Sequence, residues 1–188
     1  SMTPREMIVR VLAPDFDGDG RIGNGLLSEF YNGFPVEELR PLLTADSDLA
    51  KATGVFIAAE LGWKVHPLVL EIAALLGSRF RFDAIEALLH CTTPNDGDAL
   101  GKVLLLLDDP LSGVRWRVVQ FIRLAQRWQL TCALECAAGE CPDSVYPELR
   151  RRFRGYSVIS EQKIEWLMRH SDPVARRFGA GLAMRPRP

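Results

Sequence analysis

The chain has 188 residues, and its 47% hydrophobic and 25% charged residues are typical of a folded globular protein. Its longest apolar clusters are cut by Glu71, Lys102 or Asp108 and fall short of the roughly 18 consecutive apolar residues of a transmembrane helix, which excludes that class. The net charge of −1 conceals an asymmetry, because residues 150–188 carry ten Arg or Lys and three acids whereas the remainder carries 13 basic and 21 acidic residues. A basic end could bind a polyanion, but a basic stretch this short is more often a solvated face.

The N-terminus has no basic region followed by an apolar core and a cleavage site, so we expect a soluble cytoplasmic protein. The four cysteines could form two disulfides in an oxidising compartment, but a cytosolic helical protein usually keeps them reduced. We therefore expect free thiols at Cys91, Cys132, Cys136 and Cys141.

The first predicted element is a helix over residues 3–13, where Met7 and Val11 belong to an apolar stripe that Pro14 ends. Residues 15–25 then contain four glycines and three aspartates in eleven positions, which predicts a loop. The aromatic stretch Phe30, Tyr31, Phe34 and Pro35 follows, and we expect it to seal the end of the structure rather than to form a binding patch.

One pattern recurs from about residue 36 onward. A helix ends in Leu-Leu or Leu-Met, a short polar turn follows, and the next helix carries a basic residue near its start, in segments 39–61, 69–91, 103–125 and 164–184. If Lys51, Arg81, Arg115 and Arg176 are equivalent, the spacings are 30, 34 and 61, which leaves one degenerate repeat between residues 126 and 163. Helix pairs at such periods are typical of an α-solenoid, because one pair alone cannot bury its apolar face.

The turns between these helices carry residues that cap helix N-termini. The three turns are Asp46 to Asp48, Asp109-Pro110 and Asp172-Pro173. An aspartate there accepts backbone N–H bonds, and the prolines of the last two turns are tolerated in the first helical turn. Within the helices that follow, apolar residues recur at i, i+3 and i+4. Small residues such as Ala59 and Ala84 should let neighbouring helices approach closely.

Two segments carry the pattern in its clearest form, LLDDPLSGVRWRVVQFIRLA and LMRHSDPVARRFGAGLA. Their order of leucine pair, Asp-Pro turn and Val-Arg or Ala-Arg resembles the motif of HEAT and HEAT-like repeats. The resemblance covers residues 39–125 and 164–184, whereas residues 1–35 and 126–163 match only in helical character. In the second repeat, the shorter turn Gly77-Ser78-Arg79-Phe80 replaces the Asp-Pro turn.

The resemblance implies an all-α protein, a right-handed α-α superhelix of four to five helix pairs. Residues 2–35 would form an N-terminal cap helix and an Asp/Gly-rich loop, and residues 36–188 the HEAT-like solenoid, in a single domain overall. It says little about function, because the family includes scaffolds, inhibitors, chaperone-like factors and a few enzymes.

A calcium site is the first candidate for a bound ion. Asp15, Asp17, Asp19 and Gly20 with Ile22 match the first half of an EF-hand loop. Position 12 of that loop should be a bidentate acid, but it is Leu26, and the nearest acid, Glu29, comes three residues too late. The alternative is a turn whose carboxylates cap the next helix. Calcium is the one cofactor that we keep as a possibility.

A zinc site is the second candidate, with Cys132, Cys136 and Cys141 joined by His170 or His90. Structural zinc sites usually take close cysteine pairs from turns, whereas these cysteines lie in an apolar helical stretch. Cysteine in such a stretch usually acts as a small buried hydrophobe, and we prefer that interpretation.

No nucleophile with its base is apparent, so we expect a non-catalytic protein-binding module or scaffold, with an immunity protein that neutralises a cognate bacterial toxin as a special case. The alternative is a nucleic-acid-binding protein or a DNA glycosylase-like enzyme of the same fold, which would need a basic groove. The candidate binding residues are Arg115, Trp116, Arg150, Arg151, Arg152, Arg154, Arg176 and Arg177, and the groove would add Lys163 and Arg169 with Trp128 or Trp166. An isoelectric point near 6.3 favours the protein partner, and packing between repeats is the plainer role for the tryptophans.

Overall fold

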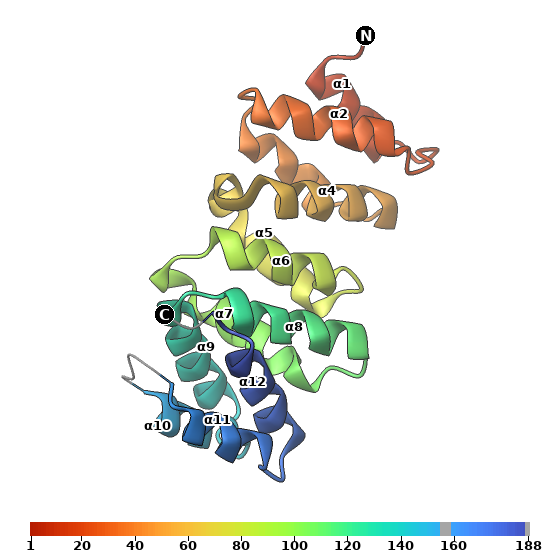
Figure 1. Cartoon of the computed structure of the whole chain (residues 1–188). Helices are drawn as coiled ribbons and strands as arrows, with labels where there is room; N and C mark the ends of the chain where they lie inside the picture. Colours follow the sequence, from red (N-terminus) through yellow and green to blue (C-terminus); the bar gives the residue numbers. More distant parts are fainter. Residues whose placement is uncertain (155–158, 187–188) are drawn as a thin grey trace. The chain divides into compact units, whose positions relative to one another are not determined.

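The computed structural model describes residues 1–154 and 159–186, and every regular element in those ranges is a helix (Figure 1). The predicted all-α class is therefore confirmed. The chain divides into two compact units, unit 1 over residues 1–92 and unit 2 over residues 93–188. No helix among the described residues is long and apolar enough to span a membrane.

Unit 1 is built from short helices that pack mainly on their neighbours along the chain. α2 and α6 both pack on α4, α3 packs on α4, and α5 and η3 pack on α6. The elements are α1 (Pro4–Leu12), α2 (Gly20–Tyr31), η1 (Val36–Leu39), α3 (Arg40–Leu43), α4 (Asp48–Leu61), η2 (Gly62–Leu68), α5 (Val69–Ala74), η3 (Leu75–Gly77) and α6 (Arg81–Cys91).

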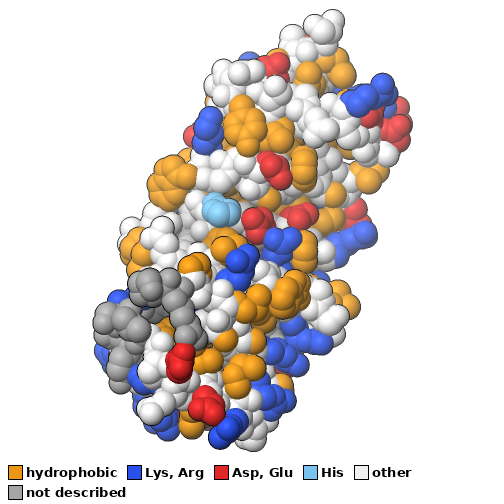
Figure 2. All heavy atoms as spheres, viewed as in Figure 1, with side chains coloured by type: hydrophobic (Ala, Val, Ile, Leu, Met, Phe, Trp, Pro, Cys, Tyr) orange, Lys and Arg blue, Asp and Glu red, His pale blue; other side chains and the backbone are white. Residues whose placement is uncertain are grey.

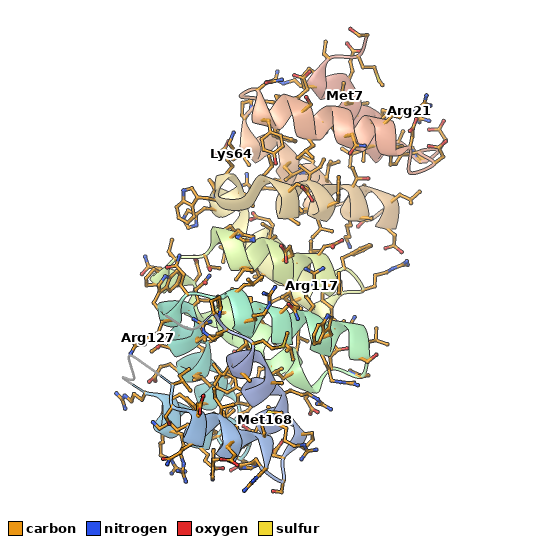
Figure 3. All side chains as sticks on the ribbon, in the orientation of Figure 1. Met7, Arg21, Lys64, Arg117, Arg127 and Met168 are labelled. Carbon is orange, nitrogen blue, oxygen red and sulfur yellow. The ribbon has the colours of Figure 1, made fainter. Side chains whose placement is uncertain are left out.

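The first helix is confirmed, but the loop predicted over residues 15–25 is too long, because α2 already begins at Gly20. Asp19 caps α2 by accepting a hydrogen bond from the Arg21 backbone amide at 2.9 Å, which starts the helix inside the predicted loop. The glycines beyond this cap are helical. A Cβ at Gly25 would lie 3.4 Å from Met7 Sδ of α1, an ordinary van der Waals distance, so α1 and α2 are in contact here (Figure 3).

Unit 2 consists of helices that pack against one another, and two of its main contacts join helices that are not neighbours in the chain. α7 packs on α9, α9 on α10, α11 on α12, and α8 on both η5 and α12. The predicted degenerate repeat between residues 126 and 163 therefore contains a helix pair, α9 with α10. The elements are η4 (Pro94–Asp96), α7 (Gly97–Leu105), η5 (Leu106–Asp108), α8 (Ser112–Leu124), α9 (Arg127–Glu140), α10 (Tyr146–Phe153), α11 (Glu161–Met168) and α12 (Pro173–Ala183).

The predicted caps fall close to their expected places. Asp172 caps α12 by accepting from the Val174 amide at 2.8 Å, and Asp109 accepts from the Leu111 amide at 2.9 Å in the turn before α8. At α4 the capping side chain is Ser47 rather than either flanking aspartate, and its hydroxyl accepts from the Ala50 amide at 3.3 Å.

Two of the arginines predicted to be equivalent make the same contacts. Arg115 Nη1 donates to the carbonyls of Asp109 and Pro110 at 2.7 and 3.1 Å. Arg176 Nη1 donates to the carbonyls of His170 and Ser171 at 2.8 and 2.9 Å. In both cases the guanidinium binds the turn that precedes its own helix, which fixes the turn to the helix.

Glycines mark close contacts between helices. A Cβ at Gly54 of α4 would lie 2.9 Å from Leu42 Cβ of α3, and one at Gly179 of α12 would lie 2.7 Å from Leu167 Cβ of α11. Gly54 follows Lys51 by the same interval as Gly179 follows Arg176. The first and last predicted repeats therefore have a glycine at the same interval after the basic residue, and each of these glycines faces a leucine of the preceding helix.

Candidate functional site

The three aspartates of the predicted calcium loop all have protein partners. Asp15 pairs with Arg10 at 2.8 Å, and Asp17 accepts from the Asp19 amide at 3.1 Å. Asp19 bonds the backbone and the guanidinium of Arg21, and these bonds hold the pKa of its carboxyl below the ordinary value (Figure 3). Each carboxylate therefore has a role in shaping the turn before α2.

Replacement of Asp19 by alanine is expected to lower the midpoint of thermal unfolding, because the Arg21 amide loses its acceptor. Asp19→Asn, the matched control, keeps an oxygen acceptor and should lose less. The depressed pKa means that the stabilisation by Asp19 is present at neutral pH and is lost as pH falls below about 4.

Calorimetry with and without millimolar calcium tests the predicted calcium site. We expect no change in the midpoint of thermal unfolding, and a rise in the midpoint that Asp17→Asn abolishes would contradict this.

The structure has all four cysteines as free thiols. Burial raises the pKa of the Cys132 and Cys136 thiols on α9, with further contributions from nearby Glu135 and Asp98. Within residues 1–154 and 159–186, no three potential ligand side chains are grouped closely enough to hold a metal ion. Cys136 instead packs beside α7, where its Cβ would be 2.7 Å from a Cβ added at Gly101.

The arginines predicted to bind a partner are largely engaged within unit 2. Arg150 and Arg154 approach the Glu135 carboxylate at 3.5 and 4.0 Å, and Arg177 donates to the Leu107 carbonyl at 2.8 Å. Arg115 and Arg176 hold their turns, as described above. Of the remaining predicted residues, Arg151 is exposed on α10 and Trp116 is 55% exposed on α8.

Arg152 and Trp166 form the most specific contact of this basic segment. The Arg152 guanidinium carbon lies 4.2 Å from the centre of the Trp166 ring. Trp166 lines a shallow hollow of about 340 Å³ on α11, together with Gln162, Glu165, Arg169 and His170. His170 Nδ1 accepts from the Asp172 amide at 2.9 Å, so Nε2 carries the proton that it donates to Glu148 at 3.2 Å. Within the lining, Arg169 pairs with Glu165 at 2.8 Å, and the Trp166 and His170 rings lie edge to face with centres 5.2 Å apart.

Sequence reasoning missed an exposed aromatic surface in unit 1 and placed one of its residues, Tyr31, in the stretch expected to seal the end of the structure; Phe30 of that stretch is buried, but Tyr31 is exposed. We define the aromatic edge as Tyr31, Phe56, Glu60, Trp63, Lys64 and His66. Trp63 is 59% exposed, Tyr31 50% and Phe56 40%. Figure 2 shows hydrophobic and acidic side chains side by side on the face that covers α4 and α6.

Backbone contacts fix the aromatic edge to three helix ends. The Tyr31 hydroxyl at the end of α2 donates to the Glu60 carbonyl near the end of α4, at 2.7 Å. His66 Nδ1 lies 2.9 Å from the carbonyl of Cys91, the last residue of α6, and must donate because a carbonyl only accepts. The C-terminal ends of α2, α4 and α6 therefore lie together along one edge of unit 1 (Figure 1).

Gly62 sets the direction of Trp63. Its φ of 60° lies in the left-handed region, where a side chain would be strained, and it ends α4 so that η2 can begin. The Trp63 ring then stacks on His66, with ring centres 4.7 Å apart and planes 6° from parallel. Lys64 lies just beyond α4, with Nζ 5.6 Å from the centre of the Tyr31 ring (Figure 3).

No protein-family model matches the sequence, and comparisons with curated proteins and with solved structures find no match. The HEAT-like resemblance therefore stays a prediction from the repeat motif.

Proposed function

We propose that this chain is a non-catalytic protein-binding module and that the aromatic edge of unit 1 is its partner-binding surface. The observation that carries the proposal is the exposure of Trp63, Tyr31 and Phe56 on elements fixed by hydrogen bonds between helix ends. Trp and Tyr dominate the binding energy of protein interfaces, because they bury much area while losing little conformational entropy.

The fold proposed with this function is a HEAT-like α-solenoid of four to five helix pairs. The matching turn contacts of Arg115 and Arg176 support it, as do the matching close approaches at Gly54 and Gly179. Repeats of this kind present equivalent helices side by side, which gives a partner a wide and rigid surface.

Truncation of an exposed tryptophan tests the proposed surface. The immobilised protein is incubated with a lysate of its native host, and the captured proteins are identified. The affinity of each captured protein for the purified variants is then measured. Trp63→Ala is expected to weaken partner binding about tenfold or more, as for an interface hot spot. Trp116→Ala is the matched control, because Trp116 is similarly exposed on α8 of unit 2, and it should leave the affinity unchanged.

The outcomes of this experiment distinguish the proposed surface from the alternative hypotheses. Loss of binding in Trp116→Ala alone would move the partner surface to α8, which the sequence favoured. If the protein captures only nucleic acid, and salt releases it, the proposal of a protein-binding module is contradicted. If the partner is a bacterial toxin whose activity the chain suppresses at equimolar ratio, the module is an immunity protein.

The nucleic-acid alternative, including a glycosylase-like enzyme, has weaker support. Phosphate recognition needs several cations free to track a backbone. In unit 2, Arg150 and Arg154 approach Glu135, and Arg152 lies over Trp166.

A further inference from the structure

The charge of unit 1 restricts the kind of partner that can approach the aromatic edge. Residues 1–92 contain 8 Lys or Arg and 13 Asp or Glu. This acidic excess repels acidic partner surfaces and attracts basic ones, and it raises the association rate of the latter.

The backbone adds to this field at the aromatic edge. Each α-helix carries about half a negative charge at its C-terminal end. The ends of α2, α4 and α6 lie together there, as the bonds from Tyr31 to the Glu60 carbonyl and from His66 to the Cys91 carbonyl show. The exposed Glu60 side chain adds a full negative charge on α4. Lys64 of the same edge offsets that charge locally, so the attraction for a further cation comes from the helix ends and from the acidic excess of unit 1.

The aromatic rings favour a flat cation over a compact one. The Trp63 ring stacks on His66 on one side, yet the residue remains 59% exposed. A guanidinium can stack on an indole while its N–H groups donate to carboxylates or carbonyls, whereas a lysine ammonium offers only a point charge. The same chain provides an example of this contact, with Arg152 lying 4.2 Å over Trp166.

From these observations we infer that the aromatic edge binds an arginine side chain presented by a basic protein partner, stacked on Trp63 and paired with Glu60. This inference rests on the proposed function and specifies the chemistry of its partner. Lys64 already places its ammonium over the neighbouring Tyr31 ring, which leaves Trp63 as the ring for the partner's arginine.

The test uses a blocked peptide of alternating Arg and Gly, with Lys-Gly and Glu-Gly peptides of equal length as comparisons. Binding to the full chain is followed by two-dimensional NMR, with the Trp63 indole N–H resonance assigned from Trp63→Phe. We expect the arginine peptide to shift that resonance and to bind several-fold more tightly than the lysine peptide. Added salt should weaken the binding.

Variants connect this binding to the proposed contacts. Trp63→Ala is expected to weaken arginine-peptide binding roughly fivefold or more, and Glu60→Gln to weaken it about twofold while the Glu60 carbonyl stays in place. Trp116→Ala, the matched control, should bind like the wild type. If Trp63→Ala does not fold, as judged by far-UV circular dichroism, Trp63→Leu replaces it.

Three results would overturn the inference: no shift at the Trp63 indole, equal binding of the lysine peptide, or arginine-peptide binding that survives Trp63→Ala. Failure of the proposed function is distinguishable. If binding of the captured partner requires Trp63 but not the partner's own arginines, the proposed function is supported and the arginine inference is wrong. If the peptide binds as expected but no protein partner requires Trp63, arginine recognition at Trp63 is supported and the proposed protein-binding function is wrong.

Discussion

Replacement of Gly181 by alanine is expected to destabilise unit 2 by about 1–3 kcal/mol. A Cβ at this position of α12 would lie 2.6 Å from Ile122 Cγ2 and 3.0 Å from the Val119 carbonyl oxygen of α8. Ile122 is fully buried, so it cannot move aside into solvent. Gly101→Ala should behave alike, because its Cβ would meet Cys136 Cβ at 2.7 Å and the Ala137 backbone nitrogen at 3.1 Å.

The matched control is Gly139→Ala on α9, where an added Cβ meets no neighbouring group within 4 Å among the residues that the structure describes. Alanine is a better helix former than glycine, so this variant should gain about 0.5–1 kcal/mol. Urea unfolding monitored by circular dichroism, with hydrogen exchange to assign the change to unit 2, measures both effects. Equal effects at Gly181 and Gly139 would show that α12 does not approach α8 as closely as the structure has it.

The Tyr146→Phe substitution is expected to destabilise unit 2 by about 1–3 kcal/mol, because it removes a buried hydrogen bond. The Tyr146 hydroxyl donates to the Leu104 carbonyl at 2.7 Å, and the residue is only 4% exposed. The control is Tyr31→Phe, which removes a bond of the same type and the same 2.7 Å length from a residue that is 50% exposed. Water can replace the hydroxyl there, so the loss should stay below about 0.5 kcal/mol.

The pH dependence of stability provides a second measurement of the Tyr146 bond. Burial raises the pKa of the Tyr146 hydroxyl, with nearby Asp108 as the next cause, so the folded state favours the neutral phenol. The stabilisation is therefore complete below pH about 10, the value for an unfolded tyrosine, and is lost as pH rises further. Urea unfolding between pH 9 and about 11 should show a steeper loss for the wild type than for Tyr146→Phe. Parallel curves would contradict the buried bond.

The presence and the order of the helices could be predicted from the sequence, because they depend on local patterns. The helices that follow the turns, α4, α6, α8 and α12, all lie within the predicted repeats. The start of α2 was not readable, because an Asp/Gly-rich run is typical both of a loop and of a cap, and only the bond from the Arg21 amide to Asp19 decides between them. The close helix contacts at glycines could not be predicted either, because the sequence does not show which helix lies opposite Gly181.

The candidate surface was harder to predict than the fold. Val55 and Phe56 are adjacent in an apolar stretch of α4, yet Val55 is fully buried and Phe56 is 40% exposed. Spacing at i, i+3 and i+4 admits either residue, and the neighbouring helices select one. The internal contacts of the predicted binding arginines were hidden for a related reason: Arg150 pairs with Glu135 on the preceding helix, α9, and no local pattern indicates that pairing.

The reach of contacts along the chain also bears on how the two units fold. In unit 1, bonds such as those from Tyr31 to Glu60 and from Arg40 to Glu71 join residues 29 and 31 positions apart. In unit 2, Arg185 of the segment after α12 donates to the Ile122 carbonyl of α8 across 63 positions. Distant contacts cost more loop-closure entropy and slow folding. Docking of α12 onto α8 should therefore be the slowest step, and pulse-labelling hydrogen exchange should find α4 amides protected before those of α12.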